Sequence, residues 1–577
     1  MNRKLSTILL IAISTLFLLM GCSKKESGIS GSFKGTGEGH SGPITVEITL
    51  DNNKLTDAKV LEIQDSGWAQ PAATTIVEQA VSTGSIENLD AVSGATHTSD
   101  GTKAALKAAF DSANVTSTEK VAAVNTEKAV LEDVTCDIVI IGAGGAGLTA
   151  ATAAENAGAS VIILDKMPMV GGNTNYATGG LNASETSIQK AQGVEDSNEQ
   201  FYQDTFIGGH ELGDPELIHT FVNNSAETVD WLIAHGVALA RVKRMGGSTN
   251  SRTHQPADGS AIGAYFVKAM DKAAREAGAE IRLNSKVIEI ISENGKATGV
   301  KVETKDGIYT VNAKAVILAS GGFGANPEMI VKYKPELEGF GTTNAPSATG
   351  DGLNLVTPFN ADYVDLEQIQ THPTVVPVKN IMITEAVRAQ GAILVNREGK
   401  RFVQELETRD VVSKAELEQT GGTAFLVFDQ DIRDGLAAIN SYAKLGLLTQ
   451  ADSIEELGNA IGIDSEALAS TITQYNLFVE TGKEPDFGRF DLTEKIDNGP
   501  FYAVEVAPAV HHTMGGVKIN TNTEVINKDG EVIPGLFAAG EVTGGIHGGN
   551  RLGGNAVADI AIFGRIAGTN AAAYIEK

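Results

Sequence analysis

A glycine-rich turn near residue 142 has the spacing of a dinucleotide-binding loop. Gly142, Gly144 and Gly147 form the pattern G-x-G-x-x-G directly after the apolar run 137–141. The first glycine allows a tight turn, the second lets a pyrophosphate approach the backbone, and the third lets helix and strand pack closely. Asp165 follows Gly142 by 23 positions, where a carboxylate can bind a ribose hydroxyl. A structural glycine turn is the alternative, but the surrounding strand–helix–strand pattern favours a binding loop.

A second group of chemically capable residues is spread over the C-terminal half of the chain. Histidine, arginine, glutamate and threonine occur there in five short segments: QTHPT at 370–374, ITEAVR at 383–388, TRD at 408–410, HHTMGG at 511–516 and NRLGGN at 550–555. Taken singly, His372 before proline is more often a turn residue, and Glu385 with Arg388 is more often a solvated helix pair. Arg409 beside Asp410 is more often a surface ion pair. The ordered set, rather than any single member, favours a functional site.

Two further segments complete a pattern that resembles a known family. GGNT at 171–174 follows the second apolar run, and GLFAAGE at 535–541 lies near the C-terminus. With the glycine turn, they resemble the FAD-binding domain of the succinate dehydrogenase and fumarate reductase flavoproteins. The five polar segments, in this order, resemble the soluble fumarate reductases of the flavocytochrome c type. The resemblance covers roughly residues 133–577 and implies non-covalently bound FAD.

The resemblance implies a binding role for each matched residue. The implied FAD-binding residues are Gly142, Gly144, Gly147, Asp165, Lys166, Gly172, Asn173, Thr174, Gly180, Glu541, Asn555 and Ala556. Fumarate is a planar dicarboxylate, so a site for it needs cations and hydrogen-bond donors at both ends. By resemblance, Arg551 and His512 hold one carboxylate. His372 and Thr384 hold and polarise the other, which prepares the alkene to accept a hydride.

Hydride addition to an alkene leaves a carbanion that needs a proton. The resemblance assigns this proton to Arg409, an arginine that acts as an acid. Arginine is ordinarily a poor acid, with a pKa above about 12. The resemblance therefore also implies that Glu385 and Arg388 form a relay that reprotonates Arg409. These two residues are three positions apart and share one face if their segment is helical.

The segment DAVSGAT at 90–96 indicates a second flavin. It resembles the covalent attachment motif of electron-transfer domains, in which the threonine hydroxyl forms a phosphoester with FMN. The resemblance thus implies covalent FMN on Thr96. An ordinary loop before a helix capped by Thr98 or Ser99 is the alternative. The chain has no C-x-x-C-H haem attachment motif. FMN is therefore expected to supply electrons to FAD, where the flavocytochrome relatives use haems.

The first 22 residues have the layout of a bacterial lipoprotein signal. Arg3 and Lys4 precede an apolar stretch at 5–20, and Cys22 follows a small residue. This resemblance implies cleavage before Cys22 and lipidation of its thiol, which would place the protein on the extracytoplasmic face of the cell membrane. An uncleaved membrane anchor is the alternative. Cys136 is the one other cysteine in the sequence, so neither an internal disulfide nor a zinc cluster is expected.

The net charge of the chain limits the classes of binding partner that are expected. A formal net charge of −27 over 577 residues repels phosphate backbones, so nucleic acid is not expected. The expected partners are fumarate and succinate, the membrane through the lipid anchor, and a membrane electron donor or flavinylated redox protein.

The elements that must position these residues follow from the hydrophobic pattern. Strands at 43–50 and 58–63 and helices near 72–81 and 102–112 predict a small α+β module. Two apolar runs, 137–141 and 159–164, flank a helix near 150–157 and predict a βαβ unit. Further strands are expected at 287–291, 299–303 and 315–318, and further helices at 453–461, 465–479 and 556–573.

The predicted fold is α/β: a Rossmann-like FAD-binding domain with an inserted α+β capping domain, preceded by a small α+β FMN-binding domain. The predicted boundaries are 1–21 for the signal peptide, 22–31 for a tether, 32–113 for the FMN-binding domain, 114–132 for a linker, 133–363 and 506–577 for the two parts of the FAD-binding domain, and 364–505 for the capping domain. The capping domain is expected to close over the substrate and exclude water.

Two other functions stay open at this point. The chain could reduce another α,β-unsaturated acid, such as urocanate or methacrylate. Urocanate-reducing relatives are expected to carry tyrosine at the position of His372 and aspartate at that of Glu385, so the pair in this sequence favours fumarate. The second alternative is a non-catalytic lipoprotein that binds a solute or shuttles electrons; the solute-binding kind would lack flavin.

Overall fold

The computed structural model describes residues 28–39, 42–63, 70–87, 89, 96–113, 115, 129–258 and 260–576. The predicted signal peptide with Cys22, and residues 90–95 of the predicted FMN motif, lie outside the described residues. The chain divides into two compact units, Met1–Asn125 and Thr126–Lys577. Among the described residues, no helix combines the length and hydropathy needed to cross a membrane.

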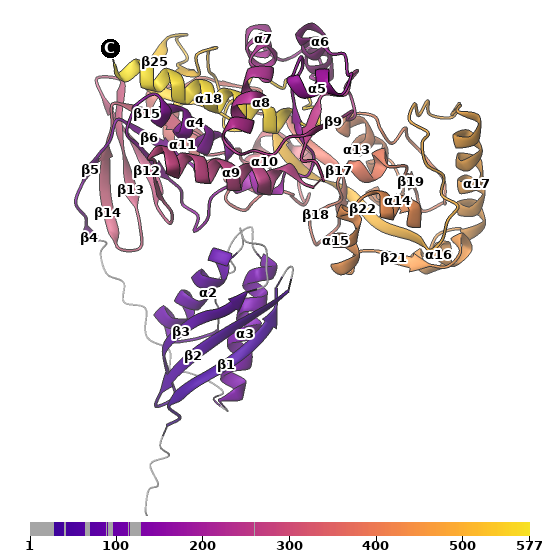
Figure 1. Cartoon of the computed structure of the whole chain (residues 1–577), viewed down its shortest axis with the longest axis horizontal. Coiled ribbons are helices and arrows are strands. Elements are labelled where there is room, and N and C mark those ends of the chain that lie inside the picture. Colours follow the sequence, from indigo (N-terminus) through magenta and orange to yellow (C-terminus); the bar gives the residue numbers. More distant parts are fainter. Residues whose placement is uncertain are drawn as a thin grey trace, which may run out of the picture. The chain divides into compact units, whose positions relative to one another are not determined.

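The N-terminal unit is a three-stranded antiparallel sheet with two helices (Figure 1). Its elements are β1 (Gly31–Glu38), β2 (Pro43–Asp51), β3 (Lys54–Ile63), α2 (Gln70–Thr83) and α3 (Thr96–Ser112). Side chains alternate between the two faces of a strand, so Ile44, Val46 and Ile48 of β2 all reach the buried face. The predicted hairpin and both predicted helices are confirmed.

Two features of this unit differ from the expectation. The sequence pattern does not predict β1, because its glycines interrupt the alternation of apolar residues. Those glycines let α3 pack closely, since a Cβ at Gly37 would lie 2.2 Å from the carbonyl oxygen of Gly101. The second difference is that α3 begins at Thr96, six residues earlier than expected. Thr98 and Ser99 lie inside the helix, so the alternative in which one of them caps it is wrong.

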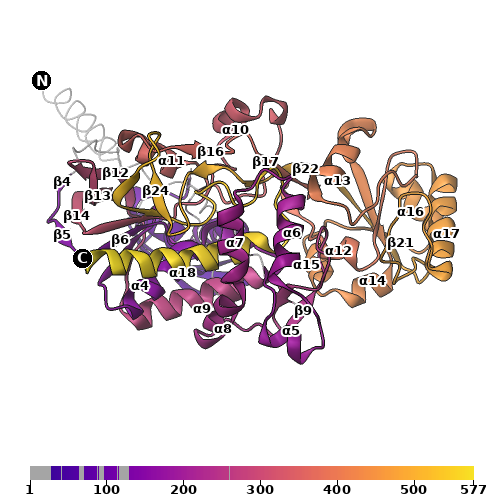
Figure 2. The same ribbon diagram turned by 90° about the horizontal axis from the view of Figure 1, so that it is seen from above.

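The second unit is built around a six-stranded sheet in the order β11-β7-β6-β15-β25-β24, parallel except for β24. These strands are β6 (Ile138–Ile141), β7 (Val161–Leu164), β11 (Glu280–Arg282), β15 (Ala315–Leu318), β24 (Glu524–Ile526) and β25 (Val532–Ala538). The predicted βαβ unit is β6, α4 (Gly145–Asn156) and β7. Helices α9 (Ile262–Ala277) and α18 (Asn555–Ile575) pack on α4 (Figure 2). This Rossmann-like arrangement confirms the predicted fold class.

Smaller elements surround this sheet. A mixed sheet contains β4 (Ala129–Val130), β5 (Val134–Thr135), β12 (Lys286–Glu293), β13 (Lys296–Glu303) and β14 (Gly307–Asn312). Short strands β8 (Leu181–Asn182), β9 (Arg241–Lys243) and β10 (Thr253–Gln255) form one further sheet, and β16 (Tyr363–Val364) pairs with β23 (Gly516–Val517). The remaining helices are α5 (Ser187–Ala191), α6 (Asn198–Gly208), α7 (Pro215–Asn223), α8 (Ser225–Ala234), α10 (Pro327–Tyr333) and α11 (Asp351–Val356).

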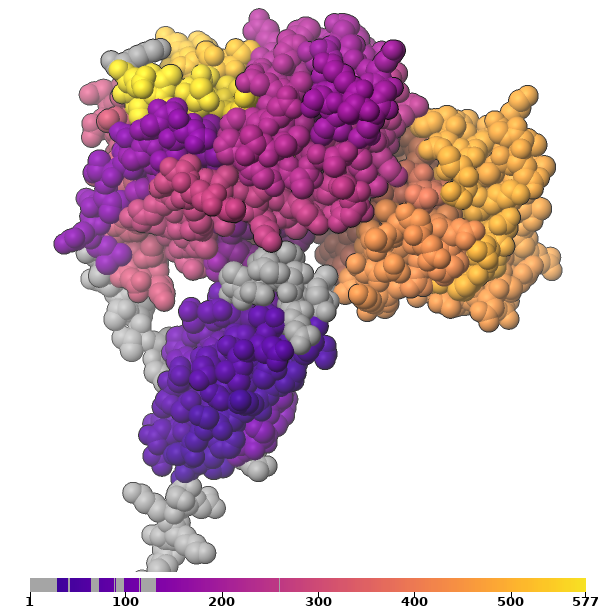
Figure 3. Space-filling view, viewed as in Figure 1, coloured from indigo at the N-terminus to yellow at the C-terminus, as the bar shows by residue number. Residues whose placement is uncertain are grey.

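A region with its own hydrophobic core, between residues 383 and 506, forms a lobe beside the FAD-binding region (Figure 3, orange). Its sheet contains β17 (Ile369–Val376), β18 (Ile381–Met382), β19 (Ile393–Val395), β20 (Ala424–Phe428), β21 (Thr449–Ala451) and β22 (Phe501–Thr513). Its helices are α12 (Ala386–Ala389), α13 (Arg409–Leu417), α14 (Gln430–Gly435), α15 (Ala438–Lys444), α16 (Ile454–Ile461) and α17 (Ser465–Thr481).

Strands β17 and β22 connect the two cores. Ile369 of β17 and Val510 of β22 belong to the large core, whereas Val504 and Val506 of β22 belong to the core of the lobe. The two strands pair antiparallel with each other. Residues in the middle of this pair therefore lie at the junction between the FAD-binding region and the lobe.

Candidate active site

The glycine turn lies between β6 and α4 and lines a cavity that is open to solvent. Gly142 has a φ of 109°, and a Cβ there would lie 2.4 Å from the carbonyl oxygen of Ala319. A Cβ at Gly147 would lie 1.9 Å from the carbonyl oxygen of Gly142, because helix and strand meet there. Gly144 has open space beside it, with its nearest atom at 3.9 Å. The turn therefore forms the predicted cradle, whose open side faces the cavity.

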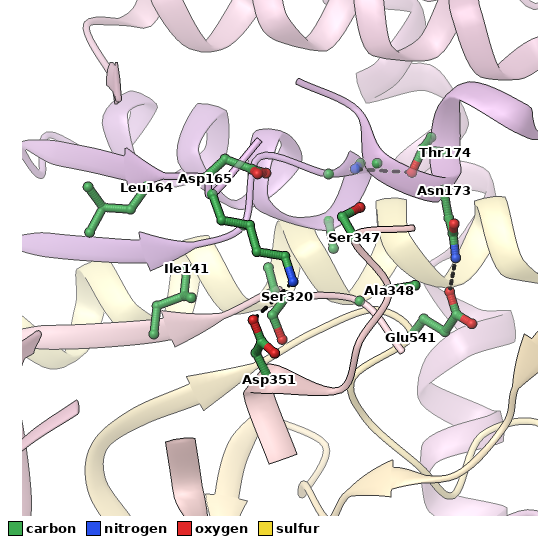
Figure 4. A pocket seen from close by; sticks show the side chains of 18 of the residues that line it. Ile141, Leu164, Asp165, Asn173, Thr174, Ser320, Ser347, Ala348, Asp351 and Glu541 are labelled. Carbon is green, nitrogen blue, oxygen red and sulfur yellow. Dashed lines mark hydrogen bonds and ion pairs between the residues drawn. The ribbon is translucent and has the colours of Figure 1, made fainter. Parts of the chain in front are cut away.

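Asp165 and Lys166 follow β7 and line the same cavity. The carboxylate of Asp165 accepts hydrogen bonds from the backbone N–H groups of Ala143 and Met167, both at 2.8 Å. Burial raises the pKa of Asp165. Lys166 pairs with Asp351 at 2.9 Å, and both line this cavity, in which Figure 4 labels Asp351. Asp351 has no motif around it in the sequence, so sequence reasoning missed it.

Glu541 closes the other end of this cavity. Its carboxylate accepts hydrogen bonds from Asn173 Nδ2 and from the backbone N–H of Thr513, both at 3.1 Å. Figure 4 shows Asn173 pointing toward Glu541, with Thr174 beside it. Thr174 Oγ1 accepts from the N–H of Gly145 at 3.1 Å. Hydrogen bonds thus connect three segments that are far apart in the sequence: the glycine turn, Asn173 with Thr174, and Glu541. Burial raises the pKa of Glu541.

The remaining residues that the resemblance assigned to FAD binding do not all line the same cavity. Gly172 lines the first cavity, whereas Gly180 and Ala556 line a second one. Asn555 is fully buried and accepts a hydrogen bond from Asn182 Nδ2 at 2.7 Å. Its place supports the start of α18 rather than lining either cavity.

The second cavity shares Asn173, Thr174 and Glu541 with the first, so the two cavities are neighbours. It collects nearly all residues that the polar motifs singled out. Those that line it are His372, Thr384, Glu385, Arg409, His512 and Arg551. They come from β17, the segment between β18 and α12, the start of α13, the end of β22 and the loop before α18. The described structure thus brings the five motifs together.

Arg409 and Glu385 are in direct contact in this cavity. Nε and Nη2 of Arg409 both lie 3.1 Å from the Glu385 carboxylate. Burial by itself would raise the pKa of Glu385, but Arg409 and Arg388 together hold it below its usual value. The Arg409 side chain is 11% exposed and that of Glu385 8%. The alternatives of a surface ion pair and a solvated helix pair are therefore wrong.

Gln370 joins Arg409 to the opposite wall of the cavity. Its Oε1 accepts from Arg409 Nη1 at 3.2 Å, and its Nε2 donates to the backbone oxygen of Arg551 at 2.8 Å. It also donates to Asn550 Oδ1 at 2.6 Å. Gln370 stands in the QTHPT motif, yet sequence reasoning gave it no role, because its partners are remote in the chain.

Arg388 lies behind Glu385, outside the cavity wall. Its Nη1 donates to the backbone oxygen of Glu405 at 2.6 Å, and its own carbonyl accepts from Arg489 at 2.7 Å. Helix α12 is a single turn, and Glu385 stands just before it. Burial lowers the pKa of Arg388, and Glu385 opposes this shift through its charge. The expected pairing of these two residues is thus electrostatic.

The histidines of the site are buried on β17 and β22. The rings of His372 and His511 lie 5.1 Å apart, and His511 Nδ1 is 2.7 Å from Thr343 Oγ1. Burial lowers the pKa of His372 well below its usual value, and the charge of Arg409 lowers it further. The same is true of His511. His372 lies in a strand rather than a turn, so its alternative reading is wrong. Sequence reasoning gave His511 no role, although it adjoins His512.

Arg551 and His512 form the side of the cavity nearest Glu541. Burial lowers the pKa of His512 well below its usual value, and Arg551 adds to this effect. Of the two arginines that line the cavity, Arg551 is buried and Arg409 is partly buried, and their cationic form disfavours protonated histidine beside them. The site therefore offers positive charge on arginine and neutral histidine donors, an arrangement that suits a small carboxylate ligand.

Thr384 is held at the lobe side of the cavity. Its N–H donates to the hydroxyl of Tyr442 at 3.0 Å, and Thr178 Oγ1 donates to its Oγ1 at 3.2 Å. Tyr442 belongs to α15 of the lobe, whereas Thr178 belongs to the FAD-binding region. Thr384 therefore sits where the two regions meet.

Comparisons with known proteins agree with this geometry. A family model described as an FAD binding domain matches residues 137–557, and one described as an FMN-binding domain matches residues 39–111. The chain is 47% identical over 445 residues to the fumarate reductase (cytochrome) of Shewanella frigidimarina, over 77% of this chain and 78% of that one. It is 34% identical over 591 residues to the urocanate reductase of Eggerthella lenta, over 97% of each.

A solved structure has the same fold. The open conformation of a flavocytochrome c3 fumarate reductase aligns with a TM-score of 0.67 and 43% identity, over 77% of this chain and 79% of that one. The predicted FAD and FMN cofactors are confirmed at the level of domains. A solute-binding lipoprotein without flavin is excluded by the same matches. The chain belongs to the FAD-binding flavoprotein family that includes these fumarate reductases, and it carries an FMN-binding domain as well.

Proposed function

We propose that this protein reduces fumarate to succinate. The observation that carries the proposal is the second cavity, where Arg409, Arg551 and three neutral histidines meet beside the cavity that fits FAD. Cationic and neutral donors on opposite walls match a dicarboxylate. The identity to fumarate reductases supports the same substrate.

In this mechanism the two ends of the substrate are held by different regions. Arg551 and His512 bind one carboxylate on the FAD-binding side, and His372 and Thr384 bind the other near the lobe. Donors at that second carboxylate withdraw electrons from the alkene. FAD, when bound, supplies the hydride that the alkene accepts. Closure of the lobe over the cavity excludes water from the reaction.

Arg409 then gives one proton to the substrate carbanion. The ionised carboxylate of Glu385 lies 3.1 Å from Arg409, next to the group that has just lost a proton. Glu385 takes a proton from Arg388, which is buried behind it, and passes that proton to Arg409. Through these two hydrogen bonds, Gln370 fixes the position of the Arg409 guanidinium relative to the backbone of Arg551. Each turnover thus consumes one hydride and one proton.

The test is a substrate profile of flavin-loaded protein. Oxidation of a reduced dye is followed with fumarate, urocanate and methacrylate as acceptors. We expect fumarate to give the highest kcat/KM, because His372 and Glu385 favour it over urocanate. If urocanate or methacrylate gives an equal or higher rate, that compound replaces fumarate as the proposed substrate. Urocanate is the second candidate, because the chain is similar to a urocanate reductase along 97% of its length.

Electrons are proposed to enter through FMN bound covalently to Thr96. Support comes from the FMN-binding family match at residues 39–111 and from Thr96 as the first residue of α3. Peptide mass spectrometry of protein made with a flavin transferase should find FMN on the peptide that contains Thr96. If this peptide is unmodified although the flavin transferase in the same culture is active, electron entry through FMN on Thr96 is refuted.

We also propose that a lipid on Cys22 anchors the protein at the extracytoplasmic face of the cell membrane. The supporting observation is the signal-like sequence before Cys22. When cells that express Cys22→Ser are fractionated, we expect the protein in the soluble fraction rather than in the membrane fraction. If the variant stays in the membrane fraction, the anchor is of another kind.

A further inference from the structure

Helix α13 carries a row of buried polar side chains from its first residue to its last turn. Arg409 is the first residue, and Ser413 and Glu416 follow four and seven positions later, a spacing that places all three on one face. Ser413 is 2% exposed and Glu416 fully buried, whereas Val411 and Leu417 of the same helix are 42% and 46% exposed. The row thus extends from the cavity, which Arg409 lines, along the buried face of the helix to its last turn.

Several buried polar atoms on this row and on the nearby Arg388 make no hydrogen bond of ordinary geometry among the described residues. They are Ser413 Oγ, Oε1 and Oε2 of Glu416, and Nε and Nη2 of Arg388. Arg388 uses Nη1 on the backbone of Glu405, which leaves its other donors free. A buried polar atom without a partner is costly. Several such atoms in one region usually mark a functional site or bound water.

Glu416 and Arg388 act on each other through their charges. Burial raises the pKa of Glu416 well above its usual value, and Arg388 together with the N–H of Ala424 in β20 opposes this only in part. The carboxyl therefore favours its neutral, proton-carrying form. The charged groups that act on Arg388 are Glu385, Arg409, Glu416 and Glu405.

We propose that Glu416 is a further member of the proton-delivery route: it passes a proton to Arg388 and takes a new one from water at the exposed end of α13. This inference rests on the proposed function, in which Arg409 loses one proton in each turnover. After Arg388 has reprotonated Glu385, Glu416 gives its proton to Arg388.

The transfer leaves a carboxylate beside a cation, which is a favourable pair in a buried place. Solvent at the exposed end of α13 then returns one proton to Glu416. Ser413 lies on the cavity side of Glu416, between Glu416 and Arg409 on the helix. One proton enters the protein for each proton that reaches the substrate, and no electron moves.

The test is Glu416→Gln in the full-length, flavin-loaded protein. Glutamine keeps the size of the side chain but cannot pass on a proton. We expect kcat to fall about ten- to a hundredfold, while KM and FAD content stay unchanged. The solvent isotope effect on kcat should increase, and activity should decline with rising pH from a lower pH than in the wild type. Glu418→Gln, an exposed neighbour on the same helix end, should match the wild type.

Two further measurements guard against a folding defect. Glu416→Asp keeps a proton donor and should recover part of kcat. Infrared difference spectra should show a protonated carboxyl band in the wild type that is missing in Glu416→Gln. Wild-type kcat, isotope effect and pH profile in Glu416→Gln would overturn the proposal, even if its melting temperature falls. A wild-type protein that reduces no enoate would instead overturn the proposed function.

Discussion

At the scale of single residues, burial decides which groups of the site carry charge. Burial lowers the pKa of His372 and His512, so the histidines are neutral donors. The positive charge therefore rests on Arg409 and Arg551. Glu385, held ionised by Arg409 and Arg388 against the effect of its burial, is the negative group in contact with Arg409. A guanidinium fork also fits a carboxylate more closely than a protonated histidine would.

Replacement of Arg409 should separate substrate turnover from cofactor binding. Arg409 lines the second cavity but not the first, so Arg409→Ala should retain FAD. It should lose the proton donor, and kcat should fall at least about 10²–10⁴-fold. The flavin absorption spectrum and the rate of fumarate-dependent dye oxidation are the measurements. Arg275→Ala, an exposed arginine on α9, is the control. Substantial residual activity in Arg409→Ala would refute its role as the acid.

At the scale of elements, the site depends on close packing at strand ends. The glycine turn works because β6, α4 and the end of β15 approach each other within the distance that a side chain would need. In the lobe, a buried network of Arg401, Glu405 and Arg489 holds the segment that carries Arg388. Both arrangements stabilise the backbone on which the functional side chains stand.

A methyl group at Gly147 should abolish FAD binding without any change in the cavity lining. A Cβ there would lie 1.9 Å from the carbonyl oxygen of Gly142, so α4 must move away from β6. Purified Gly147→Ala should carry much less FAD than the wild type, as measured by the FAD released on denaturation, which separates it from FMN bound covalently to the chain. Full FAD occupancy in a folded Gly147→Ala protein would contradict the close packing of helix and strand.

Loss of Glu405 should destabilise the lobe. Its carboxylate pairs with Arg401 at 2.7 Å and with Arg489 at 3.1 Å, and all three side chains are at most 5% exposed. Glu405→Ala leaves the buried guanidinium of Arg489 without its anion and leaves Arg401 with Glu484 as its remaining carboxylate partner at 3.2 Å, which costs about 3–5 kcal/mol of unfolding free energy. Thermal and denaturant unfolding measure this loss. Glu480→Ala, which removes an exposed ion pair with Lys495, should leave stability unchanged.

The same carboxyl predicts how stability depends on pH. Burial would raise the pKa of Glu405, but Arg489 and Arg401 hold it below its usual value. Because the folded pKa is depressed, the contribution is present above the unfolded value of about 4.3 and is lost as pH falls through the folded pKa. Glu405→Ala should therefore show a weaker loss of stability in acid than the wild type. An identical acid dependence would contradict this origin.

At the scale of the whole molecule, the FMN-binding domain and the FAD-binding domain lie in two separate compact units. The FMN-binding match lies within the first unit and the FAD-binding match within the second. The predicted reduction of substrate uses residues of the second unit alone. Electron entry and substrate reduction should therefore be separable by mutation.

Thr96→Ala provides that separation. A small reduced dye can reach the FAD-binding unit directly, so the variant should keep its dye-driven fumarate reduction. It should lose the covalent FMN, and with it the reduction driven by membranes that contain the physiological donor. Thr56→Ala, an exposed threonine on β3, is the control and should keep both activities. Wild-type membrane-driven rates in Thr96→Ala would show that electrons enter elsewhere.

The sequence by itself showed the glycine turn and the βαβ unit, and its resemblance to known families indicated both flavin domains and the polar motif residues that line the second cavity. Such features depend on short-range spacing, which the sequence displays directly. Only the tertiary structure revealed the contacts of Gln370, His511 and Asp351 and the burial of Glu416. Their meaning depends on burial and on partners remote in the chain, such as Gln370 with Arg551 and Lys166 with Asp351. Charge and protonation follow from burial, and burial exists only once the chain has folded.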